Sequence, residues 1–94
     1  MKTNPKINIA VLVSGGGSNL RALINAQKKG LLHSGRIALV ISGRADAYAL
    51  KRAEKAGIPT AVAAKNACGG QAGMEARICA LLEEYAVDLI VLAG

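Results

Sequence analysis

Four short apolar runs alternate with three stretches whose apolar residues recur at helical spacing, and this alternation constrains the fold more than any other feature of the chain. The runs cover residues 7–13, 37–41, 60–63 and 89–93. The first and last are almost continuously apolar and contain several β-branched residues, which is typical of buried parallel strands. Strands that alternate with helices form a parallel sheet with right-handed crossovers and helices on its faces. The sequence therefore predicts a doubly wound, Rossmann-like α/β fold with the order βαβαβαβ.

The chain length predicts one unit over residues 1–94, because a chain of this size has a single core. No apolar run approaches the roughly 18 residues that cross a bilayer, so no membrane partner is expected. The charged first residues are not followed by the long apolar region of an export signal. These features favour a cytoplasmic protein.

Capping and helix-breaking residues predict where the helices begin and end. Ser18 or Asn19 can cap the first helix and Asp46 the second, because their side chains accept hydrogen bonds from free amides. The first helix should end near residue 29, and the second at Gly57, where a left-handed conformation is inexpensive. A loose loop that includes Gly73 should precede the third helix. The predicted apolar faces of the three helices are Leu20, Leu23, Ile24 and Leu31; Ala49, Leu50 and Ala53; and Met74, Ile78, Leu81, Leu82 and Tyr85.

The net charge of +6 is distributed unevenly. Residues 1–65 hold eleven Lys and Arg against two acids, a net of +9, whereas residues 66–94 hold one Arg against four acids, a net of −3. A positive field suits nucleic acid or a phosphorylated metabolite, although a solvated basic surface explains it equally well. Nucleic acid is the poorer candidate, because Tyr48 and Tyr85 are the only aromatic residues and provide no stacking platform.

A glycine-rich turn, residues 14–20 (SGGGSNL), follows the first predicted strand. In open α/β sheets, ligands bind at the carboxyl ends of the strands. The glycines let the backbone approach a ligand, and the free N–H groups of the turn and the following helix converge where the helix dipole favours an anion. The residues predicted to bind a substrate phosphate are Gly16, Gly17, Ser18, Asn19 and Leu20.

The turn does not match the common nucleotide fingerprints. G-x-G-x-x-G would need glycine where Leu20 stands, and the second strand is followed by residues 42–44 (SGR), without the acid of an NAD site. The Gly-Lys-Ser/Thr of a P-loop is also missing. Two alternatives stay open: a tight turn without any ligand, and a non-catalytic module that binds phosphate or a mononucleotide.

Three segments together resemble the phosphoribosylglycinamide formyltransferase family, the folate-dependent enzymes of purine synthesis. They are residues 9–20 (IAVLVSGGGSNL), residues 45–59, which contain ADAYALKRA and AGIP, and residues 88–94 (DLIVLAG). The resemblance implies that residues 17–20 hold the ribose phosphate of glycinamide ribonucleotide. It also implies transfer of a formyl group from the co-substrate 10-formyltetrahydrofolate to the glycinamide amine.

The resemblance places the family's catalytic Asn, His and Asp beyond the strand that ends this chain. It therefore assigns no catalytic residue here, and we expect the amino-terminal portion of a longer formyltransferase that is inactive alone. Two positions depart from the family pattern. Gly43 stands where the family usually has Asn, and Gln71 stands at about the place of an Arg near the folate, so Gln71 is expected to be a weak folate contact.

The remaining chemically active residues predict neither a metal site nor a catalytic centre. His33 should lie at the amino edge of the sheet, roughly 15–20 Å from the glycine turn, too far for proton transfer. Cys68 and Cys79 lack the spacing of metal ligands and are expected to be free thiols, Cys68 in a Gly-rich loop and Cys79 packed within the third helix.

The last predicted strand, residues 89–93, is apolar on both faces, as a central strand would be. The chain supplies no later strand to pair with it, and an apolar edge strand tends to pair with another chain. Self-association through this strand is therefore expected, and a purely structural fragment is a third alternative.

Overall fold

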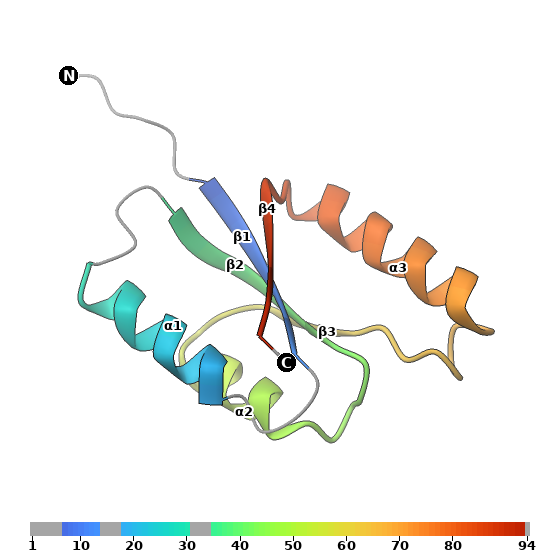
Figure 1. Ribbon diagram of the computed structural model, residues 1–94, viewed down its shortest axis with the longest axis horizontal. Coiled ribbons are helices and arrows are strands. Elements are labelled where there is room, and N and C mark those ends of the chain that lie inside the picture. Colours follow the sequence, from blue (N-terminus) through green and yellow to red (C-terminus); the bar gives the residue numbers. More distant parts are fainter. Residues whose placement is uncertain (1–6, 14–17, 31–34, 94) are drawn as a thin grey trace.

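The computed structural model describes residues 7–13, 18–30 and 35–93, and it has the predicted α/β architecture (Figure 1). The four strands form one parallel sheet in the order β3-β2-β1-β4. The elements are β1 (Ile7–Val13), α1 (Ser18–Lys28), β2 (Gly35–Ser42), α2 (Tyr48–Lys55), β3 (Thr60–Val62), α3 (Gln71–Glu84) and β4 (Leu89–Leu92).

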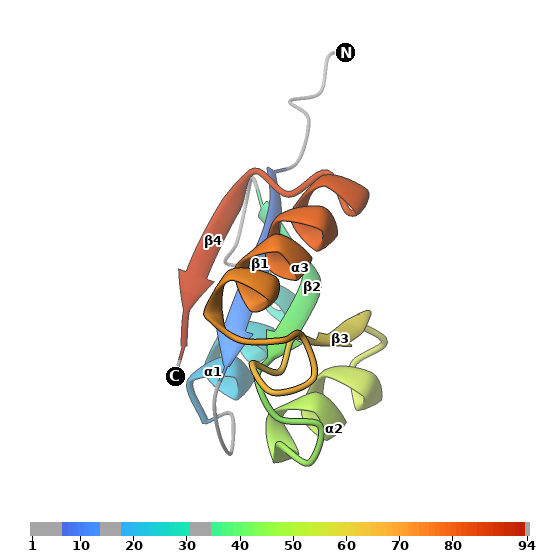
Figure 2. The same ribbon diagram turned by 90° about the vertical axis from the view of Figure 1, so that its right-hand side faces the viewer.

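The helices cover both faces of the sheet, with α1 and α2 on one side and α3 on the other (Figure 1). Figure 2 shows α3 in front of the sheet and α1 behind it. Each face has its own apolar core, because successive side chains of β1 point to opposite sides. Val11 packs with α1 and α2, whereas its neighbour Ala10 packs with α3. The predicted apolar faces are confirmed for α2 and α3, and for Leu20, Leu23 and Ile24 of α1.

One irregularity separates β1 from β2. Ile9 pairs with Ile37 but Ala10 pairs with Leu39, so Ala38 is an extra residue in β2. Ile37 and Val40 consequently share one core although they are three positions apart. The side chain of Gln27 in α1 accepts a hydrogen bond from the Ile37 amide at 2.6 Å, which gives a partly buried amide beside the irregularity an acceptor.

Three predicted helix details are wrong. Asp46 does not cap α2. The N-cap residue is Ala47, which makes no side-chain capping hydrogen bond, and the Asp46 carboxylate pairs with Arg44 instead. Ser18 and Asn19 are the first two residues of α1, so neither precedes the helix as its cap. Gly73 belongs to the first turn of α3 and not to a loop. The prediction for the end of α2 is confirmed, because Gly57 follows the C-cap residue Ala56 and has a φ of +76°.

Cys79 is exposed, so the prediction that it packs within the third helix is wrong, whereas Cys68 is partly buried in the loop before α3. The predicted positions of Leu31 and His33 lie outside the described residues. Within the described chain, β4 pairs with β1 alone, so the expectation that this chain leaves its last strand at an edge of the sheet is confirmed. Leu92 is 78% exposed.

Candidate phosphate site at the carboxyl edge of the sheet

The order of the strands reverses beside β1. The chain passes from β1 to β2 and β3 on one side, and then places β4 on the other side of β1. In open α/β sheets, ligands bind at this switch point, outside the carboxyl ends of the two strands that flank it. The amide of Ala93 donates to the carbonyl of Leu12 at 2.9 Å, which keeps β4 beside β1 to the end of the sheet. β1 ends at Val13 at this edge, and α1 begins at Ser18.

The structure describes only part of the segment predicted to bind phosphate. Gly16 and Gly17 lie outside the described residues, and α1 begins at Ser18. Asn19 and Leu20 therefore lie in the first turn of α1, where the backbone N–H groups have no acceptor within the helix. The side chain of Asn19 is exposed, whereas that of Leu20 is fully buried in the core beneath α1. Leu20 can therefore offer a ligand only its backbone amide.

The electrostatics of this helix end favour an anion. The first turn of α1 contains no acidic residue. The positive end of the helix dipole is therefore not compensated by a carboxylate from that turn, and the free amides point in the same direction. The arrangement suits a phosphate or a carboxylate.

The neighbouring carboxyl end, that of β2, is closed by a local hydrogen-bond network. The buried hydroxyl of Ser42 accepts a bond from the amide of Arg44 and donates one to its carbonyl, both at 3.0 Å. The guanidinium of Arg44 then forms a two-point ion pair with Asp46, with both distances 3.2 Å. This hydrogen bond, and the positive charge of Arg44, hold the pKa of Asp46 below its usual value. Because Asp46 already neutralises it, Arg44 is not an obvious phosphate ligand.

Gly43 lies in the same turn, at the position where the resemblance expects Asn. A Cβ atom added there would meet only the Ala63 carbonyl oxygen, at an ordinary 3.9 Å. The backbone thus accepts a side chain at this position. Glycine in place of asparagine at position 43 therefore removes a polar side chain from the carboxyl edge of the sheet, and the backbone there could have held either residue.

Gln71, the predicted folate contact, is the first residue of α3 and is exposed. Its side-chain amide donates to the Glu75 carboxylate at 2.7 Å, within the same helix. The adjacent turn is attached to the sheet by Arg77, whose Nε donates to the Val62 carbonyl at 2.9 Å. The structure therefore gives Gln71 a partner on its own helix and does not bring it together with Asn19.

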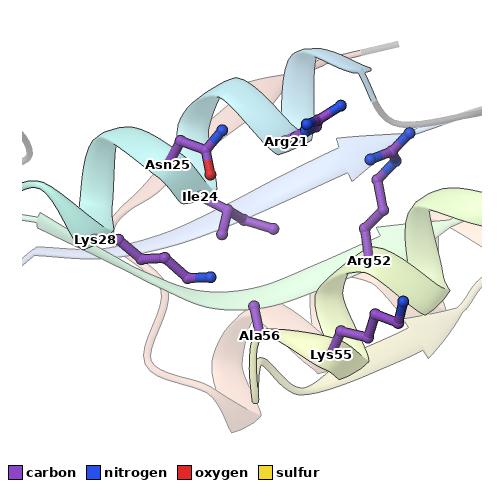
Figure 3. Close-up of a pocket in the computed structure, with 7 residues that line it drawn as sticks. All are labelled: Arg21, Ile24, Asn25, Lys28, Arg52, Lys55 and Ala56. Atoms are coloured by element: carbon purple, nitrogen blue, oxygen red, sulfur yellow. The ribbon is translucent and has the colours of Figure 1, made fainter.

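Sequence reasoning missed a pocket between α1 and α2 (Figure 3). The signal was the excess positive charge of residues 1–65, but composition does not say which basic residues share a face.

Among the described residues, no group of three or more His, Cys, Asp or Glu is arranged to hold a metal ion. No helix in the described part of the chain has the length and apolar character needed to span a bilayer.

Comparison with known proteins agrees with the fold and with the resemblance. Residues 7–94 match the formyl transferase family. The phosphoribosylglycinamide formyltransferase of Haemophilus influenzae is 48% identical over 86 residues, which cover 92% of this chain and 40% of that relative. The trifunctional purine biosynthetic protein adenosine-3 of Gallus gallus is 44% identical over 94 residues, which cover all of this chain and 9% of the relative.

Solved structures show the same similarity in three dimensions. The crystal structure of glycinamide ribonucleotide transformylase 1 from Symbiobacterium toebii has a TM-score of 0.88 and 42% sequence identity, and the match covers 95% of this chain and 42% of that protein. The chain thus spans less than half the length of each of these three proteins. Since the family match extends over nearly all of the sequence, this chain belongs to the formyl transferase family.

Proposed function

We propose that this chain binds the ribose phosphate of glycinamide ribonucleotide in an enzyme that transfers a formyl group from 10-formyltetrahydrofolate to the substrate's amine. The observation that carries the proposal is the position of α1, which begins at the switch point of the sheet with no acid in its first turn. The names of the relatives support this choice of substrate, because they describe phosphoribosylglycinamide formyltransferases.

Each residue of the turn has a separate part in the proposed binding. Glycine at positions 16 and 17 lets the backbone approach the phosphate without a Cβ atom in the way. The amides of Ser18, Asn19 and Leu20 donate to phosphate oxygens, and the exposed side chain of Asn19 adds a further donor. The buried side chain of Leu20 anchors this first turn to the core, so the donors are held in place before the substrate arrives.

In the proposed reaction, the glycinamide nitrogen forms a bond to the formyl carbon while the bond from that carbon to the folate nitrogen breaks. The amine loses a proton, and the folate nitrogen gains one. No residue of this chain is proposed to carry that proton. These 94 residues would bind and orient the substrate, and by themselves they would not catalyse the transfer.

The remaining proposals concern the folate, the location and the last strand. Gln71 would contact the folate only weakly, because its amide must first leave Glu75. The free thiols Cys68 and Cys79 agree with a cytoplasmic location, where disulfides are rare. The exposed edge of β4, which includes Leu92, would pair with a second copy, and a concentration-dependent sedimentation coefficient would support this.

Calorimetric titration with glycinamide ribonucleotide, AMP and inorganic phosphate tests the proposal. We expect saturable binding of glycinamide ribonucleotide and weaker binding of the other two ligands. Equal affinity for AMP would instead support a non-catalytic mononucleotide-binding module. Absence of saturable binding by all three would contradict both functions and leave a structural fragment.

A further inference from the structure

The pocket between α1 and α2 is small and strongly basic. Its volume is about 190 Å³, and four of its lining side chains are the cations Arg21, Lys28, Arg52 and Lys55. Figure 3 shows that these side chains come from the two facing helices, and that Lys28 of α1 and Arg52 of α2 extend into the space between them. The apolar side chains of Ile24 and Ala56 complete the wall, together with the amide of Asn25.

The spacing of the residues explains how the cations come together. Arg21, Asn25 and Lys28 follow one another at intervals of four and three residues, which places them on one side of α1. Arg52 and Lys55 are three residues apart and share one side of α2 in the same way. The contact between the two helices therefore concentrates basic groups that are dispersed in the sequence.

None of the described residues that line the pocket carries a carboxylate, and α1 contains no acidic residue. Like charges held together in a hollow with partly apolar walls raise the local potential, which favours binding of a small anion. The guanidinium of Arg52 also lies 4.8 Å from the centre of the Tyr48 ring, and this stacking restricts its position. The pocket is thus electrostatically prepared for an anionic group.

We propose that this pocket binds the phosphate or diphosphate group of a small molecule, at a site separate from the glycine turn. The volume lies below the roughly 300 Å³ at which pockets begin to enclose a drug-sized ligand, so one or two phosphoryl groups enter while the rest of the molecule stays outside. Arg21 provides a planar, two-point donor, Lys28 and Lys55 provide point charges, Arg52 adds its positive charge, and Asn25 donates through its amide.

The end of the pocket at Lys28 and Lys55 lies away from the proposed substrate phosphate. Lys28 lies seven residues beyond Arg21, about 10 Å farther along α1 and away from the end that follows the glycine turn. Lys55 is the last residue of α2. A variant at these two lysines therefore changes the far part of the pocket and leaves the turn intact. The proposal does not depend on the substrate proposed above.

Titration calorimetry of the full chain with inorganic diphosphate, at constant ionic strength, tests the proposal. We expect K28A/K55A to weaken binding at least about tenfold. The matched control K29A/K51A removes the same charge from two lysines that do not line the pocket, and it should change the affinity less than about twofold. The variant Gly16→Val, which alters only the turn, should retain diphosphate binding.

Titration with ATP shows whether the bound phosphoryl groups belong to a nucleotide or to a free anion. If a nucleotide uses the pocket, K28A/K55A should weaken ATP binding as it weakens diphosphate binding. Binding of diphosphate alone would indicate the free anion. Equal losses in the two double variants would overturn the proposal, since they would indicate diffuse attraction to net charge. Loss of diphosphate binding in Gly16→Val alone would also overturn the proposal. So would the finding that a short oligonucleotide binds through Lys28 and Lys55 far more tightly than diphosphate.

A measurement on the unaltered protein avoids any effect of substitution on folding. The side-chain amide resonance of Asn25 should shift on addition of diphosphate and saturate together with the calorimetric signal. A saturated protein with an unshifted Asn25 resonance would contradict binding in the pocket.

Discussion

The backbone amide of Asn8 donates to the Asp88 carboxylate at 2.9 Å, and the backbone amide of Asp88 donates to the Asn8 carbonyl at 2.8 Å. The side chain of Asn8 extends this exchange, because its amide donates to the Ala86 carbonyl at 3.0 Å and its carbonyl accepts from Arg36 at 3.1 Å. Strands β1 and β2 and the approach to β4 are thereby connected at the amino edge of the sheet. This connection keeps β4 beside β1, and so maintains the switch point at the opposite edge.

Replacing Asp88 by Ala should lower the free energy of unfolding by about 1–2 kcal/mol, because it removes a charged acceptor from the Asn8 amide. Urea denaturation followed by circular dichroism measures the change. Glu84→Ala, at an exposed carboxylate at the end of α3, is the matched control and should change the stability by less than about 0.5 kcal/mol. Equal losses in the two variants would contradict a specific role for Asp88.

Gly73→Ala should destabilise the protein although alanine favours helices by about 1 kcal/mol over glycine. A Cβ atom at this position would overlap the carbonyl oxygen of Cys68, and backbone cannot move aside as a side chain can. We expect a net loss of about 1–3 kcal/mol in the free energy of unfolding. Ala76→Gly, at an exposed position of the same helix, measures only the difference in helix propensity between alanine and glycine. A stabilised Gly73→Ala variant would show that the loop before α3 does not pack as described.

Gln27→Ala should cost about 1–3 kcal/mol, because the amide of Ile37 loses its acceptor beside the extra residue of β2. Thermal or urea unfolding tests this expectation. The control is Gln71→Ala, which removes the same type of side chain from an exposed position with a solvent-accessible partner. A loss no larger than that of the control would indicate that water replaces Gln27 at Ile37.

The pKa of Asp46 should lie below its usual value, because Arg44 donates hydrogen bonds to it and adds a positive charge. A depressed folded-state pKa means that the pair favours the folded state above the unfolded pKa. This contribution is lost as the pH falls through the folded pKa. A carbon-detected NMR titration measures the pKa, and Arg44→Gln should raise it. The same substitution at Arg36, which contacts Asn8, should leave it unchanged.

The order of strands and helices could be predicted from the sequence because short continuous apolar runs indicate strands, whereas apolar residues at intervals of three and four indicate helices. Asp46 could not be placed in this way, since Arg44, two residues earlier, competes for its carboxylate and the helix begins later. Gly73 suggested a loop by residue type, whereas its place in a helix depends on the close approach of Cys68. Such contacts between segments are not encoded in local periodicity.

The candidate site was predictable to a similar degree. The end of β1 at Val13 and the start of α1 at Ser18 could be predicted from the change from an apolar run to helical spacing, whereas the phosphate-binding role of the turn between them stays a prediction. The burial of Leu20 could also be anticipated from its helical spacing with Ile24. The basic pocket could not be predicted from the sequence, because it depends on which faces of α1 and α2 meet.

The most direct test of the account is a calorimetric titration of glycinamide ribonucleotide into the protein and into Gly16→Val. A valine at this position would place a branched side chain where the backbone is proposed to approach the phosphate. The account predicts that Gly16→Val retains the circular dichroism spectrum but loses binding by at least about a hundredfold, whereas Ala76→Val on α3 binds normally. Unchanged binding by a folded Gly16→Val variant would contradict the assignment of the glycine turn as the substrate phosphate site.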